Sequence, residues 1–105
     1  MTQDEAETLA SFLKLLANPN RLAIIALLRR GPRTVADIEA VLAIRQPSLS
    51  QQLGVLREGG LINAERTAKT VAYDLGEEAL QPALALLCDR LQVTGEHIAD
   101  IQPER

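Results

Sequence analysis

The side chains best able to form specific hydrogen bonds lie together in residues 48–52, which read Ser-Leu-Ser-Gln-Gln. Serine hydroxyls and glutamine amides both donate and accept hydrogen bonds. This chemistry suits non-covalent recognition, because the chain has one histidine (His97), one cysteine (Cys88) and no glycine-rich phosphate loop. Without a nucleophile–base pair or a metal-ligand cluster, we expect neither enzyme activity nor a cofactor.

A helix is expected to position these side chains. Leu49, Leu53 and Leu56 recur at spacings of four and three residues, which predicts a helix with one buried face. Pro47 is expected in its first turn, where the missing N–H has no intrahelical partner to lose. The two glycines at 59–60 are expected to end the helix, one of them in the left-handed conformation.

The outer face of this helix is compact, polar and nearly uncharged. At about 100° per residue, Gln51 points away from the leucines, and Ser50 and Gln52 flank it. An ordinary solvated helix face carries Glu and Lys, whereas a helix that enters a DNA groove needs small hydrogen-bonding groups with positive charge at the margins. Arg45 and Arg57 supply that charge. The segment is therefore predicted to read the major groove of double-stranded DNA.

Three helices are predicted before this segment. The first, residues 4–17, has an apolar stripe and ends at Asn18-Pro19-Asn20, whose asparagines are expected to cap helices. The second ends at Gly31-Pro32, a strong stop signal. Thr34 is expected to cap the third, so that residues 34–58 form a helix-turn-helix.

After the glycines the apolar period changes from 3.6 to 2. Residues 61–66 and 70–75 are predicted to be two strands joined by a turn at 67–69. Arg66 and Lys69 lie near the tip of this hairpin, and Tyr73 is expected to pack against the core. A last helix is predicted over 77–93. The expected fold is mainly α with a β-hairpin wing, in the order α-α-α-α-β-β-α.

Composition and charge favour a small helical dimer. The 105 residues are 47% hydrophobic but only 2% aromatic, which predicts one domain with an aliphatic core. A second copy of the chain could bury what one copy cannot. The net charge of −3 does not exclude nucleic acid, because residues 14–75 carry +4 and the acidic groups lie at the two ends. We expect a cytoplasmic protein, since there is no apolar span of about 20 residues and no basic leader.

The segments LANPNRLAIIALL, LAIRQPSLSQQLGVLREGGLI and KTVAYDL resemble the ArsR/SmtB family of bacterial repressors over residues 9–92. The resemblance implies a homodimer formed by the first and last helices (4–17 and 77–93), which leaves its operator when an inducer binds. It also implies DNA contacts on the reading helix and on the wing (61–75). The residues that match the family's base- and phosphate-contacting positions are Gln46, Ser48, Ser50, Gln51 and Gln52. Arg45 departs from the family, which often has Ser there, and is expected to add a phosphate contact. Arg57 is expected at the margin of the reading helix, and Arg66 and Lys69 are expected to follow the adjacent backbone or minor groove.

The sensing residues of the family are largely missing. The expected third helix has no cysteine, and on the last helix only His97 and Asp100 are suitably spaced for a metal, so we expect no metal site. The segment RQPSLSQQLGVLRE resembles most closely the BigR/SqrR-like branch of the family, whose members sense with two cysteines. Here Glu39 stands near the place of the first, and only Cys88 is near the second.

Several interpretations therefore remain open for the signal that the repressor senses. Cys88 is a small buried hydrophobe, or a single-thiol redox or sulfur sensor, or the protein senses no ligand, like NolR-like members of the family. A metal-responsive repressor is a further alternative. A winged helix used only for protein–protein contact would carry exposed aromatic or aliphatic anchors on the outer face of 48–54. That face carries Ser and Gln instead.

Overall fold

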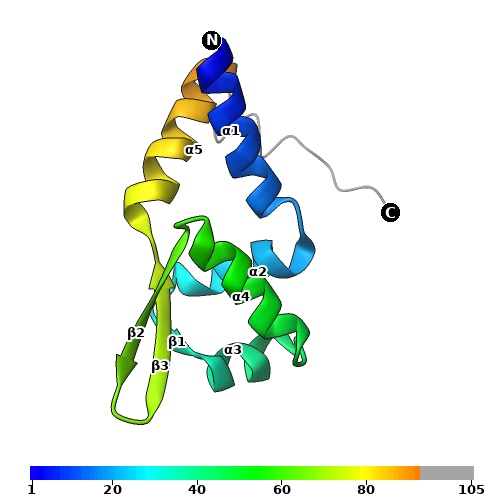
Figure 1. Cartoon of the computed structure of the whole chain (residues 1–105), viewed down its shortest axis with the longest axis vertical. Helices are drawn as coiled ribbons and strands as arrows, with labels where there is room; N and C mark the ends of the chain where they lie inside the picture. The colour runs from blue at the N-terminus through cyan, green and yellow to red at the C-terminus, as the bar shows by residue number, and fades with distance from the viewer. Residues whose placement is uncertain (93–105) are drawn as a thin grey trace.

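The computed structural model describes residues 1–92 of the chain. It has five helices and a small sheet: α1 (Gln3–Leu16), α2 (Pro19–Leu28), β1 (Arg33–Thr34), α3 (Val35–Leu42), α4 (Ser48–Glu58), β2 (Ile62–Thr67), β3 (Thr70–Leu75) and α5 (Glu77–Leu91). The predicted helical fold with a β-hairpin wing is confirmed (Figure 1).

The helix starts follow from capping side chains. Thr2 and Glu5 form a capping box at α1, and Thr34 and Asp37 form another at α3. Asn18 caps α2, as predicted, because its side-chain oxygen accepts hydrogen bonds from the backbone N–H groups of residues 20 and 21. The capping role expected for Asn20 is wrong, since this residue already lies in the first turn of α2.

The sheet has one strand more than the sequence predicts. Its order is β1-β3-β2, all antiparallel, and Arg33 of β1 lies opposite Tyr73 of β3. A two-residue strand is too short to show a period of two, which is why the pattern missed it. The hairpin turn is Ala68-Lys69 alone, because Thr67 pairs with Thr70 as the last rung of the ladder. Tyr73 is half-buried and packs against the core, as predicted.

The core lies where α2, α3 and α4 meet the base of the hairpin. Burying one Leu or Ile side chain stabilises the fold by about 1.5–3 kcal/mol, so this cluster fixes how α4 sits on the molecule. The fully buried side chains are Ile24, Leu28, Ile38, Leu49, Leu56, Leu61 and Ile62.

The two outer helices lie apart from the wing. α1 and α5 run side by side at one end of the molecule, and the hairpin tip lies at the opposite end (Figure 1). Within residues 1–92 no single helix has the length and apolar character needed to cross a membrane. Only α1 and α2 taken together pass by length and composition, and they meet at a bend of 90°.

Candidate nucleic-acid interface

Helix α4 is held by one face and exposes the other. Its leucines, Leu49, Leu53 and Leu56, are at most 2% exposed. Ser50, Gln51, Gly54, Val55 and Arg57 are exposed to solvent, and Ser48 and Gln52 are half-buried. This is the division of faces that the leucine spacing predicts, and it leaves an exposed ridge that is mainly polar apart from Gly54 and Val55.

The start of α4 is capped by a side chain that the sequence reasoning did not assign. Pro47 is the N-cap residue, one position before the predicted first turn, and it offers no side-chain hydrogen bond. The Oε1 atom of Gln46 instead accepts from the backbone N–H of Ser50 at 3.0 Å and from its hydroxyl at 2.7 Å. Gln46 thereby satisfies one of the N–H groups that every helix start leaves without an intrahelical partner.

Gln52 is bound from outside its own helix. Arg21, near the start of α2, donates from Nη1 to the Oε1 atom of Gln52 at 2.8 Å. The same guanidinium donates from Nε to the Leu15 carbonyl at 2.6 Å and from Nη2 to the Lys14 carbonyl at 3.1 Å. Arg21 therefore joins the end of α1 to the middle of α4, although no sequence pattern singled it out.

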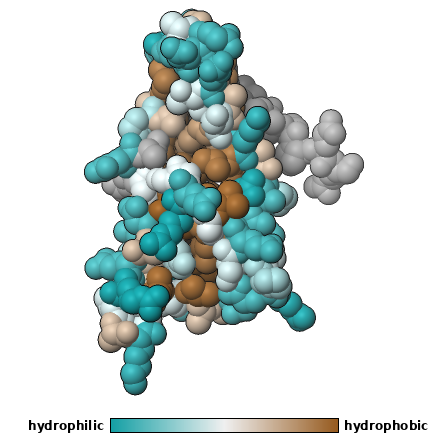
Figure 2. Space-filling model, viewed as in Figure 1, coloured by the Kyte–Doolittle hydropathy of each residue, from teal (hydrophilic) through white to brown (hydrophobic). Residues whose placement is uncertain are grey.

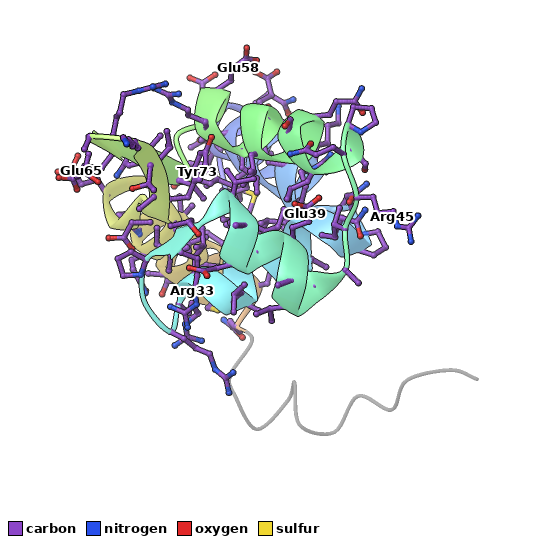
Figure 3. All side chains as sticks on the ribbon, turned by 90° about the horizontal axis from the view of Figure 1, so that it is seen from below. Arg33, Glu39, Arg45, Glu58, Glu65 and Tyr73 are labelled. Atoms are coloured by element: carbon purple, nitrogen blue, oxygen red, sulfur yellow. The ribbon has the colours of Figure 1, made fainter. Side chains whose placement is uncertain are left out.

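Positive charge frames the exposed ridge. Arg45 is exposed and projects from the start of α4, while Arg57 is exposed in its last turn. Figure 3 shows Arg45 and Glu58 near the two ends of this helix, with the hairpin beside it. Gly60 adopts a φ of 77°, so the predicted left-handed glycine at the end of the helix is confirmed.

The wing carries its two cations close to its tip. Arg66 and Lys69 are both exposed, Lys69 in the two-residue turn itself. The hydroxyls of Thr67 and Thr70 lie 3.2 Å apart and close the hairpin just below the turn. Arg33 is unlike these cations, because its Nη1 folds back onto the carbonyls of residues 31 and 32.

Candidate sensing groups are sparse in the described part of the chain. Residues 1–92 contain no group of three or more His, Cys, Asp or Glu side chains that could hold a metal ion. His97 and Asp100 lie outside the described residues. Cys88 is a free thiol, half-buried on α5, and Glu39 is half-buried on α3.

The end formed by α1 and α5 leaves apolar surface uncovered. Leu13 on α1 is 42% exposed and Leu91 on α5 is 56% exposed. A groove of about 360 Å³ opens between α2 and α5, lined by side chains such as Leu22, Ile25 and Leu84. Figure 2 shows hydrophobic atoms in a strip that begins between α1 and α5 and continues toward the hairpin and α4.

Comparison with known proteins places this geometry in a family. A model described as "Helix-turn-helix domain" matches residues 16–65. The chain is 47% identical over 76 residues to the biofilm growth-associated repressor of Agrobacterium fabrum, covering 72% of this chain but only 65% of that protein. It thus spans slightly less than two thirds of that relative's length.

Two further proteins match over more of their length. The transcriptional regulator NmtR of Mycobacterium tuberculosis is 36% identical over 93 residues, which cover 89% of this chain and 74% of NmtR. The crystal structure of the repressor BigR from Xylella fastidiosa superposes with a TM-score of 0.73 at 35% identity, covering 96% of this chain and 95% of that one. These proteins are transcriptional regulators and not enzymes. The chain therefore belongs to the ArsR/SmtB family of winged helix-turn-helix transcriptional regulators.

Proposed function

We propose that this protein is a homodimeric transcriptional repressor that binds a specific operator in double-stranded DNA, with α4 in the major groove. The observation that carries the proposal is the outer face of α4. A buried leucine stripe holds a helix whose outer face exposes the compact, uncharged and hydrogen-bonding side chains of Ser50 and Gln51, next to Gly54 and Val55. Such side chains fit a groove and bind base edges.

The cations around α4 and on the wing are proposed to bind the DNA backbone. Arg45 and Arg57 lie at the two ends of the reading helix, and Arg66 and Lys69 lie at the hairpin tip. Phosphate contacts set the register and orientation of a protein on the duplex, whereas base contacts select the sequence. We therefore assign the four cations to phosphate contacts, which supply affinity. We assign contacts with bases and nearby phosphates to Gln46, Ser48, Ser50, Gln51 and Gln52.

Dimerisation is proposed to use α1 and α5. The exposed leucines Leu13 and Leu91 and the groove beside α5 give this end apolar surface that a second copy would bury. A dimer with two-fold symmetry presents two α4 helices, which would bind two half-sites about 34–36 Å apart, one turn of the duplex, or a multiple of that spacing. We place the protein in the cytoplasm, where it has access to the chromosome.

The first candidate for the input is that the protein senses no ligand, because a chain with a single cysteine cannot form a disulfide within itself. A single-thiol sensor is the second candidate, and the free, half-buried thiol of Cys88 on a proposed dimerisation helix favours it. In that case a two-electron oxidant such as a polysulfide, itself reduced in the step, would either modify Cys88 singly or convert the two Cys88 thiols of the dimer into one disulfide with loss of two protons.

The direct test is selection of bound sequences from a library of duplexes with a randomised central segment. We expect the wild-type protein to enrich one palindromic sequence, and native mass spectrometry to show the mass of two chains. The double variant Ser48→Ala, Gln51→Ala should keep its fold and lose that enrichment. Gln3→Ala, which removes an exposed glutamine on α1, is the matched control and should enrich the wild-type sequence. A wild-type protein that enriches no sequence would contradict the proposal.

A further inference from the structure

The hydrogen bond between Arg21 and Gln52 fixes the direction of the Gln52 amide on α4. Both side chains are half-buried, and the bond joins residues 31 positions apart. Arg21 is held in place by two further bonds, to the carbonyls of Lys14 and Leu15. A guanidinium held by three partners on two different helices has little freedom to move.

The chemistry of the pair allows only one orientation of the amide. Arginine has donors and no acceptor, so the atom of Gln52 that faces it must be the carbonyl oxygen. The amide nitrogen is therefore directed away from Arg21. Within residues 1–92, Nε2 of Gln52 has no hydrogen-bond partner, and no buried side-chain nitrogen or oxygen is left unsatisfied. The NH₂ group of Gln52 accordingly reaches solvent on the reading helix.

We propose that Arg21 is a positioning residue that turns the amide of Gln52 so that its NH₂ group is the part directed at DNA. The inference rests on the proposed function of α4. A freely rotating glutamine binds adenine through one donated and one accepted bond. The bond from Arg21 occupies one of the two lone pairs of the Gln52 carbonyl and fixes its direction, so the amide does not turn freely to present both of its groups to one base. The outward NH₂ group is expected to donate to an acceptor: O6 or N7 of guanine, O4 of thymine, or a phosphate oxygen.

Arg21 is engaged mainly with the protein itself. Three of its five N–H donors, one on each guanidinium nitrogen, already bond to protein atoms, and the side chain is half-buried. The residue thus acts on DNA through Gln52, and its loss should change what Gln52 selects.

The test uses the duplex that the wild-type protein selects from the randomised library. Gln52→Glu keeps an oxygen for Arg21 but replaces the outward NH₂ with a second acceptor. We expect it to bind about fivefold to a hundredfold more weakly than wild type, since one good base contact is worth about 1–3 kcal/mol. It should also bind more weakly than Gln52→Ala, which removes the amide without adding an acceptor. The binding is measured at two salt concentrations, because salt screens the general repulsion between the new carboxylate and the DNA phosphates. The part of the loss that persists at high salt is the loss of the donated bond.

The identity of the acceptor follows from selections with the variants. If Gln52 donates to a base, Arg21→Ala should broaden the preference at one base pair per half-site, with adenine newly accepted there. Arg21→Lys, which retains a donor, should broaden it less. If Gln52 donates to a phosphate, Arg21→Ala should select the same sequence as the wild type. Gln52→Glu should then lose affinity for all sequences alike. Gln52→Glu binding as tightly as Gln52→Ala, or more tightly, overturns the proposal in both forms.

A measurement on the free protein keeps this inference separate from the operator hypothesis. Exchange of the Arg21 guanidinium protons with water, followed by nitrogen-15 NMR, should be slow in the wild type and at least several-fold faster in Gln52→Ala. Equal exchange in the two proteins would show that the bond does not form, whatever DNA the protein selects.

Discussion

Glu5 of α1 and Arg90 of α5 form an ion pair between residues 85 positions apart, with Nη2 of Arg90 2.8 Å from Oε2 of Glu5. The other carboxylate oxygen, Oε1, accepts from the backbone N–H of Thr2 in the capping box. One side chain therefore both starts α1 and ties it to α5, the two helices proposed to form the dimer.

This pair predicts a pH dependence of stability. Arg90, and after it the Thr2 backbone N–H, lower the pKa of Glu5 from 4.5 to about 2. Because the folded-state pKa is the lower one, the pair stabilises the fold above pH 4.5, and this contribution is lost as the pH falls toward 2. Glu5→Gln should melt below wild type at pH 7, and the difference should shrink between pH 5 and pH 3. Glu7→Gln, in the same helix, should show no comparable trend in thermal melts followed by circular dichroism.

Gly54 is a position where one substitution should stabilise the fold and weaken DNA binding. It lies exposed in the middle of α4, and a Cβ added there would meet no other atom within 4 Å. Glycine inside a helix costs about 1 kcal/mol relative to alanine, so Gly54→Ala should raise the free energy of unfolding by about that amount in urea titrations. If the duplex approaches this face closely, the same variant should bind the selected operator more weakly. Unchanged affinity would show that DNA stays clear of Gly54.

Ala43 lies in a conformation that suits glycine. It is the C-cap of α3, with a φ of 55°, in the left-handed region that costs an L-residue about 1–2 kcal/mol. Ala43→Gly should therefore stabilise the protein by about 0.5–1 kcal/mol, since glycine also loses more freedom on folding. The matched control is Ala40→Gly, an exposed position inside α3, which should destabilise by a similar amount. Urea unfolding of both variants checks the opposite signs.

Lys69 at the wing tip should contribute non-specific affinity. We expect Lys69→Ala to weaken binding about equally for all duplexes and to reduce the slope of log K against log salt by about 1. Lys14→Ala, which removes an exposed lysine in the last turn of α1, away from the hairpin tip, should change the slope less than Lys69→Ala. A loss confined to the selected operator would contradict a phosphate contact.

Cys88→Ser separates the two candidate inputs. A repressor that does not use its thiol should bind and release DNA alike in wild-type and Cys88→Ser form, with or without sodium tetrasulfide in a binding titration. Release of the wild type alone by tetrasulfide would establish the single-thiol sensor instead. Non-reducing gel electrophoresis of the treated wild type would then show whether two chains have become linked.

The sequence determined the features that depend on residues within a turn of one another. The spacing of Leu49, Leu53 and Leu56 sufficed to predict α4 and the side it exposes, and Asn18 and Thr34 marked two helix starts correctly. The capping contacts are local, and the leucine spacing repeats with the period of the helix, so the pattern of residue types carries the information. The change of period after residue 60 located the hairpin for the same reason.

Tertiary structure decided the contacts that join distant segments. Strand β1 exists only because β3 lies beside it, and its two residues have no period of their own. Arg21 meets Gln52, and Glu5 meets Arg90, because the buried core sets α2 against α4, while α1 and α5 lie side by side. An exposed or half-buried polar side chain has no periodic signature, so its partner follows from packing and not from spacing. The reading helix could therefore be predicted from the sequence, whereas the orientation of the Gln52 amide on it could not.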